Sequence, residues 1–183
     1  MKVGIAGAGG IGSNVAAFLA RGGVRRFTLV DGDRVEESNL NRQFYFRDQI
    51  GRLKVEALAE NLRRIAPDAE IEPVALRLDA AAMATCFDGC DVVVEGFDGR
   101  IEKKMLLEAL APRRVAVVSA SGVAGSALDS ITVRRLGTCT VIGDFCTDAG
   151  RARCYAPKVA LVAAMMAHVV LEKGGYYDNP IDP

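Results

Sequence analysis

The stretch MKVGIAGAGGIGSN, residues 1–14, decides the fold of this 183-residue chain. Residues 2–6 form a short apolar run that predicts a strand. The glycines that follow, Gly7, Gly9 and Gly12, have the G-x-G-x-x-G spacing that opens a helix after a strand. Such a turn needs backbone angles that other residues avoid, and it lets phosphate groups approach the main chain at a helix N-terminus. The stretch therefore predicts a nucleotide-binding βαβ unit.

A nucleotide-binding unit of this type also needs an acidic residue about 20 positions after the glycine turn, and the sequence has one. The next predicted strand, residues 26–30, ends at Asp31, which lies 19 positions after Gly12. At this spacing an acidic side chain can reach the ribose of a bound nucleotide. Taken alone, the glycine turn and Asp31 also fit a nicotinamide oxidoreductase, or a fold of this topology without a ligand. Both alternatives stay open at this point.

Three further segments make the pattern more specific. DGDRVEESNLNRQ occupies residues 31–43, GRLK occupies residues 51–54, and GFDGR occupies residues 96–100. Together with the glycine turn, these segments resemble the ThiF/MoeB/HesA family, the ubiquitin-activating-type adenylyltransferases, over about residues 1–175. The resemblance implies an α/β, Rossmann-like doubly wound fold and ATP as the bound nucleotide.

The resemblance also assigns roles to individual residues. It implies that Arg42, Lys54 and Asp98 are catalytic and that Asp98 binds Mg²⁺. The ATP-binding residues that it implies are Gly7, Gly9, Gly10, Gly12, Asp31, Asp33, Asn39, Arg42, Gln43 and Lys54. For Asp33 and Asn39 a role in their own turns stays open, because short polar side chains commonly cap turns and helices. For Asp98 the alternative is a turn with Gly99.

The implied reaction is ATP-dependent adenylation of the C-terminal glycine carboxylate of a small ubiquitin-fold sulfur carrier protein, with release of pyrophosphate. A ThiS-like carrier with a Gly-Gly tail, in thiamine biosynthesis, is the partner we expect. A chain-terminal carboxyl group ionises near pH 3.5, so the nucleophile needs no general base. The main need is positive charge around the phosphates. A molybdopterin-type carrier, a tRNA-modifying dehydratase activity and a noncatalytic scaffold remain alternatives, and a homodimer is expected.

The alternation of strand and helix signals predicts a mainly parallel sheet in a single domain, residues 1–183. The predicted strands are 2–6, 26–30, 70–76, 91–95 and 115–119, and the predicted helices are 11–21, 54–65, 80–87 and 101–110. Residues 130–135 and 138–142 are expected to form an antiparallel extension near the C-terminus. Residues 144–156 are expected to form a mobile loop before an apolar helix at 159–171.

Composition narrows the class of protein. The 23 basic and 23 acidic side chains balance, which gives no electrostatic reason to expect nonspecific binding to nucleic acid. The five cysteines are odd in number and irregularly spaced, as in proteins of a reducing compartment. The apolar helix is too short to span a bilayer, and no leader is apparent before the first strand. We expect a cytoplasmic protein.

The chain departs from many family members in three respects. Paired C-x-x-C motifs are missing, so no zinc is predicted. The arginine that many members carry before the first strand needs a substitute, for which the candidates are Arg21, Arg25, Arg151 and Arg153. Cys146 or Cys154 could bond covalently to the carrier if a nearby arginine stabilised the thiolate, although a packing role for both residues is the preferred interpretation.

Overall fold

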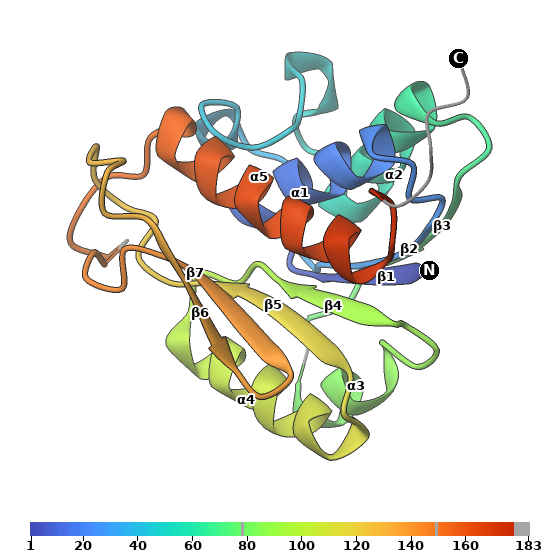
Figure 1. Ribbon diagram of the computed structural model, residues 1–183. Coiled ribbons are helices and arrows are strands. Elements are labelled where there is room, and N and C mark those ends of the chain that lie inside the picture. The colour runs from blue at the N-terminus through green and yellow to red at the C-terminus, as the bar shows by residue number, and fades with distance from the viewer. Residues whose placement is uncertain (78, 149, 178–183) are drawn as a thin grey trace.

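The computed structural model describes residues 1–77, 79–148 and 150–177, and the statements below concern these residues (Figure 1). Their seven strands form one sheet in the order β3-β2-β1-β4-β5-β7-β6. The strands are β1 (Lys2–Ala6), β2 (Arg26–Val30), β3 (Glu70–Val74), β4 (Val92–Glu95), β5 (Ala116–Ala120), β6 (Thr132–Leu136) and β7 (Cys139–Gly143). Only β6 runs antiparallel to its neighbour, β7. The doubly wound sheet and its antiparallel extension are therefore confirmed.

Five α-helices and three short 3₁₀ turns accompany the sheet in the described chain. The helices are α1 (Gly10–Arg21), α2 (Lys54–Ile65), α3 (Ala80–Thr85), α4 (Arg100–Leu110) and α5 (Ala156–Lys173), and the 3₁₀ turns are η1 (Glu37–Asn39), η2 (Arg47–Gln49) and η3 (Ala111–Arg113). Helices α1, α2 and α5 cover one face of the sheet, and α3 and α4 cover the other (Figure 1). Within the described ranges, no helix combines the length and the apolarity needed to cross a bilayer.

The alternation of side chains along β4 explains the two layers of helices. Val92 and Val94 belong to the larger core cluster beneath α1, α2 and α5, whereas Val93 belongs to the second cluster, beneath α3 and α4. Successive residues of a strand point to opposite faces, and strands buried on both faces read as continuous apolar runs. A Val-Val-Val strand in the centre of the sheet therefore accounts for a core on each side.

Several predicted boundaries were wrong by a few residues. Strand β3 ends at Val74, not at 76, because the chain turns back and Leu76 donates its N–H to the carbonyl of Val74. Helix α3 ends at Thr85, not at 87. Helix α5 is longer than the predicted 159–171, since Pro157 fits its first turn, where no N–H is needed. The predicted domain and the predicted loop include positions 178–183 and 149, which lie outside the described residues.

The order of the strands determines where a ligand can bind. Strand β1 lies between β2 and β4. The strands that follow β1 in the chain, β2 and β3, are added on one side of it, and the later strands, β4 and β5, are added on the other. In open α/β sheets a crevice forms at this switch point, at the carboxyl ends of the strands. The glycine turn, Asp31 and the segment 96–99 all follow strands that end at this edge.

Candidate functional site

A pocket of about 390 Å³ lies at this switch point. It is formed by the segments after β1, β2, β3 and β4, together with the first turns of α2 and α4. The lining residues are Gly7, Gly9, Val30, Asp31, Gly32, Asp33, Lys54, Leu76, Arg77, Gly96, Phe97, Asp98, Gly99 and Glu102. Six residues of the predicted site therefore share one cavity, namely Gly7, Gly9, Asp31, Asp33, Lys54 and Asp98.

Two glycines of the turn have steric reasons to be glycine. Gly7 has a φ of +88°, a conformation that side chains rarely allow. A Cβ atom on Gly12 would lie 1.9 Å from the carbonyl oxygen of Gly7, so only glycine lets helix α1 start this close to β1. Ser13 closes the turn, because both its backbone N–H and its hydroxyl donate to the carbonyl of Gly9. The compact turn leaves the N-terminus of α1 open towards the pocket.

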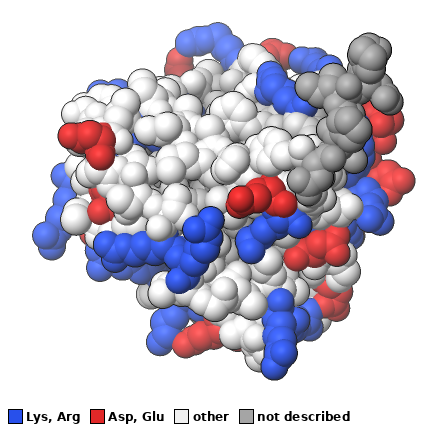
Figure 2. Space-filling view, viewed as in Figure 1, with Lys and Arg blue, Asp and Glu red and all other residues white. Residues whose placement is uncertain are grey.

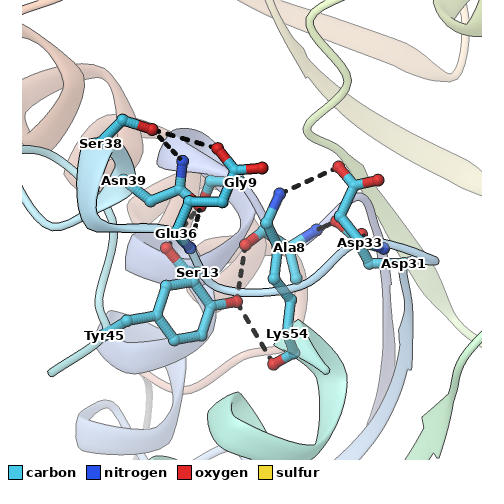
Figure 3. Close-up of polar contacts among 10 residues, drawn as sticks. All are labelled: Ala8, Gly9, Ser13, Asp31, Asp33, Glu36, Ser38, Asn39, Tyr45 and Lys54. Atoms are coloured by element: carbon cyan, nitrogen blue, oxygen red, sulfur yellow. Dashed lines mark hydrogen bonds and ion pairs between the residues drawn. The ribbon is translucent and has the colours of Figure 1, made fainter. Parts of the chain in front are cut away.

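Asp31 organises both sides of the pocket (Figure 3). Its Oδ2 accepts a hydrogen bond of 2.7 Å from the backbone N–H of Ala8, and its Oδ1 accepts one of 2.7 Å from the backbone N–H of Asp33. Each carboxylate oxygen has a second lone pair, so both can still accept bonds from ligand hydroxyls. Asp31 thus fixes the glycine turn relative to β2 while it faces the cavity.

Lys54 supplies a nearly buried positive charge to the pocket. It is the first residue of α2, and its side chain is only 9% exposed. Its ammonium lies 3.1 Å from the carboxylate of Asp33, whose side chain is 57% exposed. An ion pair with a solvated partner is weak. The ammonium can therefore exchange this carboxylate for an anionic ligand at small cost.

Tyr45 connects the glycine turn to Lys54 through the backbone. Its ring is buried, and its hydroxyl lies 2.7 Å from the carbonyl oxygen of Ala8 and 3.3 Å from that of Lys54 (Figure 3). Burial raises the pKa of Tyr45, and the nearby charge of Asp31 raises it further, so the hydroxyl stays protonated. This contact could not be predicted from the sequence, because Tyr45 lies between the recognised motifs.

Hydrogen bonds to the buried carboxylate of Glu95 fix the segment that carries Asp98. Glu95 is fully buried at the end of β4, and it accepts hydrogen bonds from the N–H of Phe97 at 2.7 Å and from the hydroxyl of Ser119 at 2.6 Å. The ammonium of Lys103 bonds to both of its carboxylate oxygens, at 3.0 and 2.8 Å. These contacts hold the turn rigidly while Asp98 itself stays exposed at the edge of the pocket.

Five predicted binding residues do not line the pocket. Gly10 begins α1, and Asn39 uses its side chain in η1, where its Oδ1 accepts from the N–H of Glu36 at 3.1 Å. The guanidinium of Arg42 donates to the carbonyl of Ser38 at 3.1 Å. Gln43 is buried, and its Oε1 has no hydrogen-bond partner among the described residues. Gly12 packs beneath the turn, as described above.

The structure adds residues that sequence reasoning missed. Leu76 and Arg77 form a wall after β3, and Phe97 and Glu102 flank the turn that carries Asp98. Phe97 and Glu102 adjoin a recognised motif, so their proximity could have been inferred. Leu76 was predicted as the last residue of a strand and Arg77 follows it, and the early end of β3 at Val74 brings both to the pocket.

The arginines proposed as substitutes lie away from the pocket lining. Arg25 pairs with Asp68, Arg21 lies over the ring of Phe44, and Arg153 lies over the ring of Tyr155. Arg151 is exposed on the segment before α5. No contact of these four residues favours one of them as the substitute, and that role stays a prediction.

The two candidate cysteines differ in their surroundings. Cys146 is exposed, whereas Cys154 is partly buried and lies within electrostatic range of Arg42 and Asp98. Burial raises the pKa of Cys154 despite the lowering effect of Arg42. This shift works against a stabilised thiolate at Cys154.

The segment at 144–156 begins with a buried anchor rather than a free loop. Asp144 accepts hydrogen bonds of 2.8 Å from the backbone N–H groups of Cys146 and Thr147, and its carboxylate lies 2.6 Å from the ammonium of Lys158. Its first residues are therefore fixed, which corrects the expectation of a loop without structure.

The lining suits a nucleotide with phosphate groups. It combines a glycine turn, a helix N-terminus and one buried ammonium with carboxylates. Across the described ranges, no set of three or more His, Cys, Asp or Glu side chains is arranged to hold a metal ion. Magnesium commonly takes only one or two carboxylates and completes its shell with phosphate oxygens and water. Asp98 at the edge of the pocket fits such a partial site.

Comparisons with known proteins agree with the fold. The ThiF family matches residues 1–173. The molybdopterin-synthase adenylyltransferase of Salmonella typhimurium is 28% identical, over 98% of this chain and 75% of its own length. The adenylyltransferase and sulfurtransferase UBA4 of Yarrowia lipolytica is 33% identical, over 65% of this chain and 30% of its own length. This chain thus spans about a third of the UBA4 enzyme.

Among solved structures, the tRNA N6-threonylcarbamoyladenosine dehydratase TcdA of E. coli, in complex with AMP, is similar with a TM-score of 0.85. The similarity covers 94% of this chain and 85% of that one, at 22% sequence identity. At this identity the likeness concerns the fold.

Proposed function

The chain belongs to the ThiF family, and we propose on this premise that it is an ATP-dependent adenylyltransferase acting on a carrier protein. The proposed substrate is the C-terminal glycine carboxylate of a small ubiquitin-fold sulfur carrier with a Gly-Gly tail. The proposal rests on one observation: the glycine turn, Asp31, Lys54 and Asp98 line the same pocket. This combination suits a triphosphate better than a nicotinamide cofactor, which would leave Lys54 and Asp98 without a role.

In the proposed reaction a carboxylate attacks the α-phosphorus of ATP, an acyl-phosphate bond forms, and pyrophosphate leaves. Both reactants are anions, so catalysis depends on positive charge and aligned dipoles. Lys54 provides a nearly buried ammonium, and the start of α1 provides backbone N–H groups. Asp31 receives the ribose hydroxyls with its free lone pairs.

Arg42 and Gln43 lie outside the pocket lining but close to the glycine turn or its neighbouring segment, and a change of side-chain conformation in Arg42 would let it contact the phosphates. Among the described residues, the guanidinium of Arg42 donates to the carbonyl of Ser38 and to the amide oxygen of Asn41, and both contacts lie near the surface. Gln43 lies close to the turn, with its Nε2 4.0 Å from the position of a Cβ on Gly9. Its Oε1 has no hydrogen-bond partner among the described residues, and its N–H groups lie on the side of Gly9, where a bound phosphate could accept from them.

Asp98 would hold a magnesium ion together with the phosphates, and the ion would neutralise charge on the leaving pyrophosphate. The role of the protein in this part of the site is to hold Asp98 in place. The buried contacts of Glu95 with Phe97, Lys103 and Ser119 support that role, because they fix the turn from which Asp98 extends.

The test is exchange of labelled pyrophosphate into ATP in the presence of a carrier that ends in Gly-Gly. We expect exchange with the wild-type protein and a decrease of about 100-fold or more in Asp98→Ala. Asp68→Ala serves as the matched control, because Asp68 is exposed and pairs only with Arg25 at a distant surface. No exchange by the wild type with any carrier, or full exchange by Asp98→Ala, would contradict the proposal.

We propose a ThiS-like carrier in thiamine biosynthesis as the partner. A molybdopterin-type carrier is the second candidate, since the relative from Salmonella is named for molybdopterin synthase. The same exchange assay with each purified carrier decides between them. Activity with a threonylcarbamoyl-modified tRNA instead of a protein would place the chain with the dehydratases.

We further propose that two copies associate through α5. On this helix Leu161, Ala164 and Met165 lie towards the surface, and none carries a charge. Figure 2 shows a broad uncharged region over α5. Large uncharged patches of this kind commonly mark interfaces. Sedimentation at micromolar concentration is expected to show a dimer that Leu161→Glu converts to a monomer, and a wild-type monomer would contradict the proposal.

The proposed location is the cytoplasm. The cysteines are free thiols, and burial raises the pKa of Cys86, Cys90 and Cys139. Free thiols are typical of a reducing compartment. Fractionation of cells that produce the protein would test this assignment.

A further inference from the structure

We infer that the hydroxyl of Tyr45 positions the groups that bind the triphosphate, an inference that rests on the proposed function. Tyr45 lies outside every recognised motif, yet its hydroxyl contacts the backbone of both the glycine turn and the first residue of α2 (Figure 3). Its side chain does not line the pocket, so it would act through these neighbours and not on the substrate.

The contact with Ala8 controls the direction of an amide in the phosphate cradle. The hydroxyl shares its single proton between two carbonyls, mainly with that of Ala8 at 2.7 Å and more weakly with that of Lys54 at 3.3 Å. In a trans peptide, the C=O of one residue and the N–H of the next lie in one plane and point in opposite directions. Fixing the carbonyl of Ala8 therefore directs the N–H of Gly9 away from Tyr45. Gly9 itself lines the pocket, where an anion would meet this N–H.

The other side of the same residue is fixed as well. The N–H of Ala8 donates to Asp31 at 2.7 Å, so both peptide planes around Ala8 are held by side chains. Asp31 and Tyr45 thus fix the turn through hydrogen bonds to the N–H and the carbonyl of the same residue, Ala8. A backbone that is held in this way needs no rearrangement when an anion binds, which is the advantage of a preorganised site.

The contact with Lys54 extends this effect to the ammonium. The hydroxyl lies 3.3 Å from the carbonyl of Lys54, whose side chain reaches Asp33 in the pocket. The same tyrosine is tied to the preceding motif, because its N–H donates to the carbonyl of Gln43. One buried residue therefore links, through its hydroxyl and its backbone N–H, three segments that are assigned to phosphate binding.

The experiment compares ATP with adenosine in Tyr45→Phe, which keeps the ring and removes only the hydroxyl. By calorimetry we expect the affinity for ATP to fall about tenfold, which corresponds to about 1.4 kcal/mol, and the affinity for adenosine to change by less than about twofold. In the exchange assay, the KM for ATP should rise while the KM for the carrier stays the same. Tyr177→Phe is the control, because that hydroxyl contacts His168 far from the pocket.

Equal losses for ATP and adenosine would indicate a general disturbance of the pocket and would overturn the inference. Unchanged affinity for both ligands would overturn it as well. The proposed function is judged separately, on the wild-type protein. If the wild type binds ATP but exchanges no pyrophosphate with any carrier, the proposed function fails, while the comparison of ATP with adenosine still decides the role of Tyr45.

Discussion

The buried ion pair between Lys158 and Asp144 predicts a large loss of stability in Lys158→Met. The two side chains are 1% and 4% exposed, and their charged atoms lie 2.6 Å apart. The ammonium also donates to the carbonyl of Ala124 at 2.6 Å. The pair connects the first turn of α5 to the residue that follows β7, so it anchors this helix to the sheet. Methionine keeps the length of the side chain but removes the charge.

The size of the effect follows from burial. At an effective dielectric constant of about 20, two unit charges 2.6 Å apart attract by about 6 kcal/mol, and desolvation of both groups offsets most of this. Removing one partner leaves the other charge buried, which typically costs about 3–5 kcal/mol. Asp144 keeps hydrogen bonds from Cys146 and Thr147. We therefore expect the lower end of the range, about 3 kcal/mol.

Urea unfolding followed by circular dichroism measures this loss as a shift of the midpoint. Lys104→Met is the control, because Lys104 pairs with Glu108 on the exposed surface of α4 and should lose less than about 0.5 kcal/mol. A double-mutant cycle with Asp144→Asn isolates the coupling between the two charges. If Lys158→Met loses no more stability than Lys104→Met, the reasoning from burial is refuted.

Four further predictions can be tested with the same preparations. Although burial alone would raise the pKa of Asp144, hydrogen bonds from Lys158 and the following turn lower it below its ordinary value of 3.8. The stability that this carboxylate contributes is thus complete above that value and is lost as the pH falls below it, and acid titration of stability should be less steep in Asp144→Asn. Gly12→Ala should abolish ATP binding in calorimetry, because its Cβ would lie 1.9 Å from a backbone oxygen. Lys54→Met should lower pyrophosphate exchange by about 100-fold or more, whereas Arg47→Met, at an exposed surface pair, should not change it. Iodoacetamide should alkylate Cys154 more slowly at neutral pH than it alkylates a cysteine-containing peptide, since burial raises the pKa of this thiol.

The sequence predicted the features that depend on local chemistry. The strand, turn and helix at residues 1–21 follow from apolar runs and from glycines that no other residue can replace. The positions of Asp31 and Asp98 at one edge of the sheet follow from the parallel topology, because the carboxyl ends of neighbouring strands share that edge. These parts of the site could be predicted because each depends on a short segment and one topological rule.

The remaining features depend on contacts between segments that are distant in the sequence. Tyr45 bonds to Ala8, 37 positions away, and nothing in the residues around Tyr45 indicates that partner. Lys158 lies just before the predicted helix at 159–171, and its burial could not be predicted, because a buried lysine becomes acceptable only when a partner such as Asp144 is in place. The wall formed by Leu76 and Arg77 depends on where β3 ends, and strand ends are poorly determined by residue preferences.

Lys54 and Lys158 differ in the exposure of their aspartate partners, and this difference separates the lysine that is proposed to bind a ligand from the lysine that stabilises the fold. Both ammonium groups are nearly buried and both pair with an aspartate. Asp33 beside Lys54 is 57% exposed, so when the pair separates, water solvates the carboxylate and the cost is small. Asp144 beside Lys158 is 4% exposed, so separation would leave a charge without solvent. The exposure of the partner, and not that of the lysine, therefore lets Lys54 change partners, as its proposed role in phosphate binding requires, and commits Lys158 to the fold.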